Sequence, residues 1–171
     1  MRQVCSVLYG YFEGLLELIT IFLMISLALV VLVAVAYRIS GSALAWYDEV
    51  ASIQLAWLTY YAGALAALKR AHIGVPGLVM ALPPHLRRPV VLLAEAVTLG
   101  FFALLGWLGV EVLLILEGDT LVSLPEVPTT LPQSVIPIGA ALFIIAQLLS
   151  LPKMLEAMDN RNEIPGEGLE P

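Results

Sequence analysis

Four long apolar runs restrict what this chain can fold into. They occupy residues 14–37, 50–68, 89–116 and 134–154. The hydrocarbon core of a bilayer is about 30 Å thick, and about 20 helical residues are enough to cross it. A lipid-exposed segment has to satisfy its backbone hydrogen bonds internally, so each run is expected to be a helix. The sequence therefore predicts an all-α integral membrane protein with four transmembrane helices.

Composition agrees with this interpretation. Hydrophobic residues make up 60% of the 171 positions and charged residues only 13%, and the mean hydropathy of +0.94 lies far above that of soluble domains. The single cysteine, Cys5, excludes a disulfide framework and a multi-cysteine metal site. The formal net charge of −6 argues against a nucleic-acid partner.

The basic residues predict the topology. With four spans both termini lie on one side, and that side would receive seven of the eight basic residues: Arg2, Lys69, Arg70, Arg87, Arg88, Lys153 and Arg161. The other side would receive only Arg38. Because cytoplasmic loops carry an excess of Lys and Arg, we expect cytoplasmic N and C termini and outward-facing acidic connections.

The chain is expected to form one membrane domain, residues 1–155, followed by a flexible acidic cytoplasmic tail, residues 156–171. The tail is polar and rich in Glu, Gly and Pro, which leaves little apolar surface to bury. The first run could instead be a cleaved signal peptide, since Ala34 and Ala36 form a small-residue pair behind it. The run is too long for that, and acids precede it where a signal peptide is basic.

Residues at the start of the second run are expected to order the outward end of the protein. Asp48 is a candidate N-cap, and Glu49 would lie at the positive end of the helix dipole. Trp46 and Tyr47 supply an interfacial aromatic anchor.

Small residues at helical spacing predict close helix contacts, because backbones in a membrane approach where side chains are small. The second, third and fourth runs each carry such residues: Ala56, Thr59, Gly63 and Ala67; Ala96, Gly100, Ala103 and Gly106; Gly139, Ala140 and Ala146. The contacts could lie within one bundle or between subunits.

Glu95 is the ionisable residue about two turns inside the third run. A charge within a span is costly and needs a partner, which the Lys69/Arg70 or Arg87/Arg88 pair could supply. A proton relay would need further ionisable groups through the middle, and residues 100–110 contain none. We therefore expect an ion pair near the interface.

The two histidines, His72 and His85, suggest a metal or haem ligand, but both lie in the connection between spans and no ligand cluster accompanies them. Nucleophile, phosphate-loop and zinc motifs are absent from the sequence too, so neither an enzyme nor a cofactor in this chain is predicted. His72 is expected to form a fixed cytoplasmic edge together with Lys69 and Arg70.

Two functions fit these features. An independent homo-oligomeric four-helix exporter would place a carboxylate within its first span, whereas the acids here, Glu13 and Glu17, lie only at the entrance of that span. An accessory subunit of a larger transporter needs contact surfaces and no ion site of its own. The sequence favours the accessory subunit.

The order of several segments resembles one family. These are "WYDEV" before the second span, then Trp57, Gly63 and Ala64, then "KRAHIGV", the Pro- and Arg-containing connection, and "LPQSVIPIGAAL", with Pro137 and Gly139, at the fourth span. Together they resemble the small membrane subunit of tripartite ATP-independent periplasmic (TRAP) transporters, the DctQ type, over about residues 15–150. Pro76 departs from the acid that often follows "HIxV" in that family, and "PEVPTTLPQS" lacks its usual aromatic residue.

The resemblance implies a stator-like subunit in the bacterial inner membrane. Its partners would be a large DctM-type membrane subunit, which carries the substrate and sodium sites, a periplasmic binding protein that delivers an organic acid, and membrane lipids. No cofactor is expected in this chain, and the sodium ions belong to the large subunit. The candidate contact residues are Trp46, Asp48, Glu49, Trp57, Gly63, Ala67, Lys69, Arg70, His72, Arg87, Arg88, Glu95, Pro137 and Gly139.

Overall fold

The computed structural model describes residues 2–70 and 83–162. Its helices are α1 (Arg2–Ile39), α2 (Tyr47–Leu68), α4 (Pro84–Ile115), α5 (Thr130–Gln133) and α6 (Val135–Asn162). Four of these carry segments long and apolar enough to cross a membrane: Leu8–Ile39, Tyr47–Leu68, His85–Ile115 and Thr130–Pro152. Within the described ranges no strand is present. The predicted four-helix membrane fold is confirmed.

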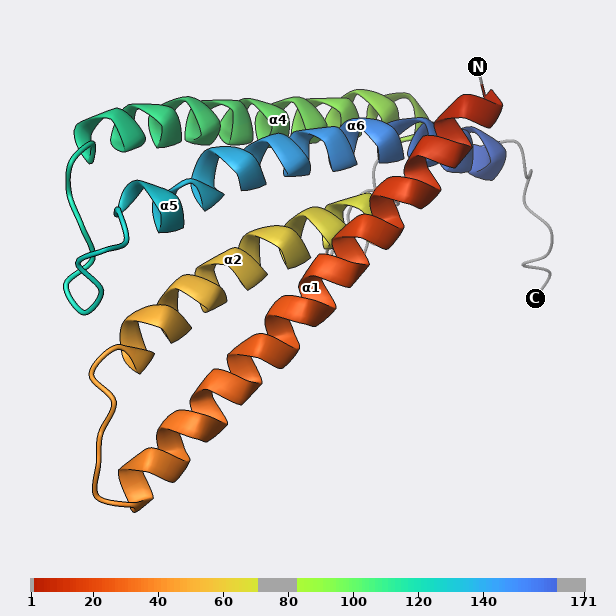
Figure 1. Ribbon diagram of the computed structural model, residues 1–171. Coiled ribbons are helices and arrows are strands. Elements are labelled where there is room, and N and C mark those ends of the chain that lie inside the picture. The colour runs from red at the N-terminus through yellow and green to blue at the C-terminus, as the bar shows by residue number, and fades with distance from the viewer. Residues whose placement is uncertain (1, 71–82, 163–171) are drawn as a thin grey trace.

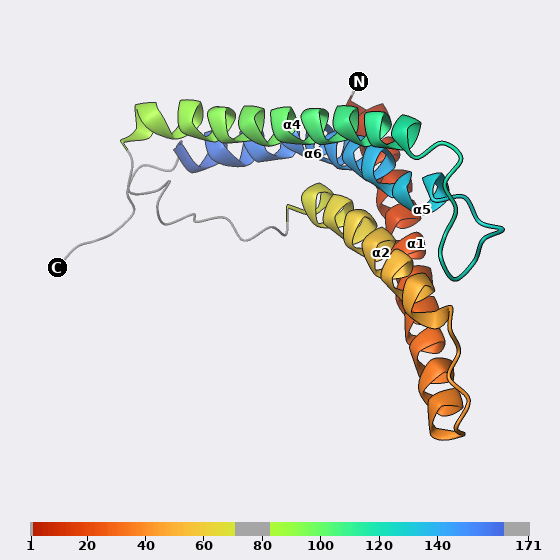
Figure 2. The ribbon, with the colours of Figure 1, turned by 90° about the vertical axis from the view of Figure 1, so that its left-hand side faces the viewer.

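The four long helices pack against one another in a series that differs from their order in the chain. α1 packs along α2, α2 packs along α6, and α6 packs along α4. In Figure 1 the pair α1–α2 and the pair α4–α6 lie close at the end where α2 and α6 finish, and they diverge toward the other end. Figure 2 shows the same divergence from the side. We call the first end the termini end and the second, which carries residues 40–46 and 116–129, the loop end.

α6 is the central helix of this series. Of its most apolar window 39% is buried, against 6% for the windows of α1 and α4. A cluster of six buried residues draws on α1, α2 and α6: Leu16, Ala64, Ala67, Leu68, Phe143 and Ala146. Half of them are alanines, as expected where membrane helices approach closely. The outer faces of α1 and α4 are therefore left for lipid or a partner.

Two helix boundaries differ from the sequence prediction. α4 begins at Pro84, whereas the prediction began at Pro89. Pro84 occupies the first helical position, where a missing N–H costs nothing, and Pro89 follows close to the helix start. α6 continues to Asn162, so residues 156–162 are helical where a flexible tail was predicted. Leucine, glutamate, alanine and methionine at 155–158 are strong helix formers, which explains the extension. Residues 163–171 lie outside the described residues.

The predicted N-cap at Asp48 is wrong. α2 begins at Tyr47, Trp46 occupies the N-cap position, and no side chain among the described residues caps it. Asp48 and Glu49 lie in the first turn, where their charges face the positive end of the helix dipole. Asp48 is already inside the helix, so it cannot act as the residue that precedes it.

Candidate functional site

A polar cluster joins three helices at the termini end. It comprises Arg70, just after α2, with Glu95 of α4 and Gln147, Ser150 and Met154 of α6. The guanidinium forms an ion pair with Glu95, donates from Nε to Ser150 Oγ (2.9 Å), and lies 3.2 Å from Met154 Sδ. The Gln147 amide donates to the second Glu95 oxygen. The Glu95 carboxylate is thus held from two sides, and the ion pair expected from the sequence is formed with Arg70.

The backbone of Arg70 explains how its side chain reaches this cluster. Arg70 has φ +52°, a left-handed conformation. Helices commonly end with a residue in this conformation, and that residue is usually glycine. For a residue with a Cβ it costs about 1–2 kcal/mol. The turn points the guanidinium toward α4 and α6, where Glu95 is 9% exposed and Ser150 only 1%. The strain is tolerated because the side chain satisfies buried groups.

A second set of contacts joins α1 to the end of α2. The Lys69 ammonium forms ion pairs with Glu17 and with Glu13 (3.3 Å), and Tyr9 Oη donates to the Leu68 carbonyl oxygen at 3.0 Å. Hydrogen bonding to Glu17, and then to Glu13, raises the pKa of Lys69 above its usual value. The acids at the entrance of the first span are therefore engaged with a neighbouring helix of the same chain.

At the loop end, Glu49 ties α2 to the connection that follows α4. Its carboxylate accepts the backbone N–H groups of Val122 (3.1 Å) and Ser123 (2.7 Å). Deeper in the span, Trp57 Nε1 donates to the Pro132 carbonyl oxygen at 3.2 Å, so α2 also holds α5. Two of the candidate residues, Glu49 and Trp57, thus connect α2 to neighbouring segments at the loop end.

Glycines allow the close approach of α6 to its neighbours. A Cβ added to Gly139 would lie 2.5 Å from Tyr60 Cδ1 on α2, and one added to Gly109 on α4 would lie 2.8 Å from Ile136 Cγ2 and 3.0 Å from Pro137 Cδ. Gly139 and Pro137 are therefore contact residues inside this chain. Gly109 was not among the predicted contact residues, although its type and position could have indicated it.

The remaining candidates do not gather at one place. Ala67 is buried in the core cluster, whereas a Cβ at Gly63 would meet no atom within 4 Å. Trp46 and Asp48 are exposed beside the start of α2, and Arg87 and Arg88 lie in the first turns of α4. His72 lies outside the described residues. Gln147 and Ser150, whose side chains complete the polar cluster, were not among the residues predicted from the sequence.

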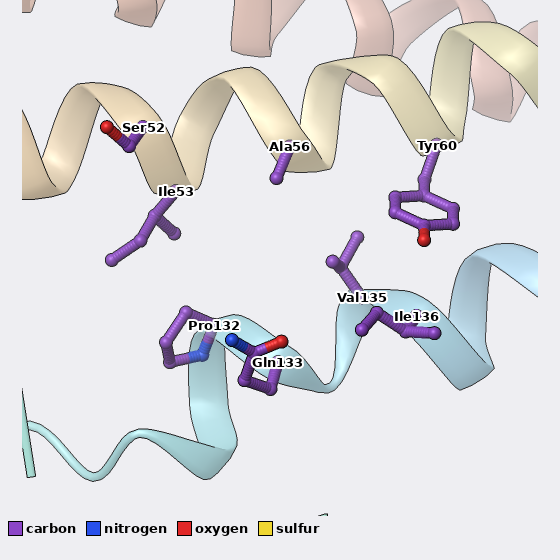
Figure 3. A pocket seen from close by; sticks show the side chains of 8 residues that line it. All are labelled: Ser52, Ile53, Ala56, Tyr60, Pro132, Gln133, Val135 and Ile136. Carbon is purple, nitrogen blue, oxygen red and sulfur yellow. The ribbon is translucent and has the colours of Figure 1, made fainter. Parts of the chain in front are cut away.

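An open cavity of about 280 Å³ lies on the side of α2 that faces α5 and the start of α6 (Figure 3). Its walls are formed by Ser52, Ile53, Ala56, Tyr60, Pro132, Gln133, Val135 and Ile136. Among the described residues no group of three or more His, Cys, Asp or Glu side chains could hold a metal ion. The charged side chains described above act as fasteners between helices at the two ends of the spans.

Comparison with known families identifies this architecture. The sequence pattern of the family described as "Tripartite ATP-independent periplasmic transporters, DctQ component" matches residues 15–156. The chain belongs to the DctQ family. No curated protein that was compared matches the chain.

The DctQ match extends over the whole of α2, α4 and α5 and all five residues of the polar cluster. DctQ proteins are components of transporters and not an enzyme family, and they associate with the other TRAP components. With four helices able to cross a bilayer, this DctQ chain is a multi-pass membrane protein.

Proposed function

We propose that this chain is the small, stator-like membrane subunit of a TRAP transporter in the bacterial inner membrane. The transporter imports an organic acid with sodium as the coupling ion. A large DctM-type subunit binds substrate and sodium, and a periplasmic binding protein delivers the substrate. The observation that carries the proposal is the DctQ match over residues 15–156.

The distribution of charge supports a role without cargo of its own. Glu95, Glu13 and Glu17 are each paired with a basic residue of the same chain at the termini end. Residues 100–110 of α4 contain no ionisable side chain. A carrier needs a polar site that is exposed in turn to both sides of the membrane, and such sites lie near the midplane.

The topology that we propose places the termini end in the cytoplasm. The positive-inside bias of seven basic residues to one supports it. The polar cluster and the Lys69 ion pairs then lie at the cytoplasmic interface, and the Glu49 contacts lie at the periplasmic one. Exposed Trp46 and Asp48 would be near a docked binding protein.

Purification of the tagged chain in mild detergent, with mass identification of associated proteins, tests this function. A co-purifying membrane protein of many spans is the expected result. Reconstituted alone into vesicles, the chain should move no solute, and uptake should require the large subunit and the binding protein. A homo-oligomer that exports solute unaided would contradict the proposal and support the exporter.

Sodium dependence provides a sharper test within the complex. Glu95→Gln should leave the sodium stoichiometry of uptake unchanged, because in this proposal the sodium sites belong to the large subunit. Glu111→Gln is a matched control, since Glu111 is a carboxylate of the same helix that accepts a hydrogen bond from Trp107 Nε1 and belongs to no ion pair among the described residues. A changed stoichiometry in Glu95→Gln alone would assign ion coupling to this chain.

A further inference from the structure

The cavity between α2 and α5–α6 is the feature that the contacts described so far leave unexplained. Figure 3 shows Ser52, Ile53, Ala56 and Tyr60 projecting from α2 on one side, with the α5–α6 side chains opposite them. It lies in the loop-end half of the spans, where the two helix pairs diverge. Tyr60, packed against Gly139, lies at the opposite end of the cavity from Ser52 (Figure 3).

The size of the cavity restricts what can occupy it. At about 280 Å³ it lies at the lower edge of the range of pockets for drug-sized ligands, about 300–1,000 Å³. A helix about 10 Å wide would fill that volume in less than one turn. A whole partner helix does not fit inside this volume, whereas a segment of one acyl chain does.

The walls of the cavity restrict the chemistry of its occupant. Ile53, Ala56, Val135 and Ile136 supply an apolar surface, and no charged residue lines the cavity. Left empty, these walls would lose their dispersion contacts, and water inside would find few polar partners. Both walls belong to membrane-spanning helices, so the thin apolar molecule available in excess beside them is a lipid acyl chain.

Polar groups lie at the loop end of the cavity. The Gln133 side-chain amide makes no hydrogen bond to another described residue and can donate to a phosphate or ester oxygen. Asp48 precedes Ser52 by one turn on the same face of α2, and the Ser52 hydroxyl donates to its carbonyl oxygen at 2.7 Å. Asp48 is exposed and lies one turn closer to the loop end than Ser52.

The acidic residues of the loop end favour one class of headgroup. Residues 116–129 contain Glu117, Asp119 and Glu126 and no basic residue, so the acids of this connection add to the charge of Asp48. An ammonium group complements this field, whereas an anionic headgroup would be repelled. We propose that the cavity binds one acyl chain of a phospholipid with an ammonium headgroup, as in phosphatidylethanolamine, from the leaflet at the loop end.

The proposal is tested with a photoreactive lipid. The chain, with whatever subunits co-purify, is placed in vesicles of phosphatidylethanolamine that include a phosphatidylethanolamine probe with a diazirine in its acyl chain. After irradiation, mass spectrometry maps the labelled residues. Label should concentrate on the cavity walls, about tenfold above the exposed face of α1, which corresponds to about 1.4 kcal/mol of preference.

Two variants separate the cavity from general lipid contact. Ala56→Phe fills the cavity from α2 and should reduce wall labelling about tenfold. Ala103→Phe adds the same side chain at an exposed position of α4 and should leave wall labelling unchanged. If Ala56→Phe does not assemble, the wild-type map alone decides: wall labelling equal to that of the α1 face would overturn the proposal.

The headgroup is tested by exchanging the probe. A phosphatidylglycerol probe should label the walls less than the phosphatidylethanolamine probe, and Asp48→Asn should reduce that difference. Equal labelling by both probes would overturn the headgroup assignment. Labelling that occurs in the isolated chain but disappears in the complex would show that a partner side chain fills the cavity, which would overturn the lipid assignment and leave the accessory function intact.

Discussion

At the scale of single residues, the Arg70 side chain contacts residues of two other helices at once. This residue combines a left-handed backbone with contacts to Glu95, Ser150 and Met154. Its Nη2 atom is buried without a hydrogen-bond partner in the described part of the chain. Local backbone preference is thus overruled by the electrostatic demand of a carboxylate buried in a span.

Arg70→Gly tests whether the backbone strain at Arg70 or its ion pair with Glu95 has the larger effect on stability. Glycine would relieve about 1–2 kcal/mol of backbone strain. It would also leave Glu95 buried without its partner at a cost of about 3 kcal/mol, the low end for buried ion pairs because the Arg70 side chain is 30% exposed. We expect a net loss, measured as a lower thermal midpoint of the purified protein.

The control for this prediction removes both charges. Adding Glu95→Leu to Arg70→Gly should recover part of the lost stability, since an apolar pair carries no desolvation penalty. A higher midpoint for Arg70→Gly alone would mean that the ion pair does not stabilise the protein.

The raised pKa of Lys69 predicts that the stability of the protein depends on pH. This pKa is raised by Glu17 and Glu13, so the stabilising effect of Lys69 is complete below the usual lysine pKa of about 10.4 and is lost as pH rises through the raised value. The thermal midpoint of the protein should therefore fall as the pH rises through the raised pKa of Lys69. Lys69→Arg keeps its charge there and should fall less; equal slopes in both proteins would refute the assignment to Lys69.

At the scale of elements, the α2–α6 contact depends on the absence of a side chain at Gly139. Gly139→Ala would place a Cβ 2.5 Å from the Tyr60 ring, and the helices would have to separate. Overpacking of this kind costs about 1–3 kcal/mol. We expect a lower thermal midpoint and weaker assembly of the complex.

Gly63→Ala on α2 is the matched control. A Cβ at Gly63 meets no described atom within 4 Å, and alanine favours a helix over glycine by about 1 kcal/mol. This variant should be neutral or slightly stabilised. Adding Tyr60→Ala should rescue Gly139→Ala, because contacting residues couple; losses that simply add would show that this contact does not limit packing.

The elements themselves could be predicted from apolar length, since hydrocarbon thickness fixes how long a span has to be. The boundaries of the helices were harder to predict. Whether Pro84 or Pro89 starts α4, and whether α6 ends near Met154 or Asn162, depends on small differences in local propensity that apolar length does not report.

The candidate site was predictable where charge required it. Glu95 had to find a cation, and two basic pairs were within reach. Gln147 and Ser150 could not be assigned, because neutral polar residues occur in many membrane helices and only the register of α6 against α4 directs them to Glu95. The four small residues predicted on α4 show the reverse: Ala96, Gly100 and Ala103 are exposed, and of the four only Gly106 approaches α6.

At the scale of the whole molecule, orientation in the membrane rests on the distribution of basic residues. Replacing Arg87 and Arg88 by glutamate removes two of the seven positive charges at the termini end. We expect part of the protein to insert in the wrong orientation, so that complex yield and uptake fall. Reactivity of a cysteine placed at Ser42 toward an impermeant reagent measures the inserted fraction in each orientation.

Arg38→Glu is the control for that experiment. It removes the single basic residue at the loop end and strengthens the bias, so orientation should be unaffected. Unchanged yield, uptake and cysteine reactivity in the Arg87→Glu, Arg88→Glu double variant would contradict the proposed topology.

The serial packing of α1, α2, α6 and α4 has a consequence for biosynthesis. A ribosome releases α6 last, yet α6 is the helix through which the first hairpin packs against α4. Until it emerges, the Glu95 carboxylate lacks the Gln147 amide, and α4 lacks the helix along which it packs, although α1 and α2 can already pair. The nascent protein therefore acquires its shape in a late step, and a chain truncated before residue 135 should be a substrate for membrane proteases.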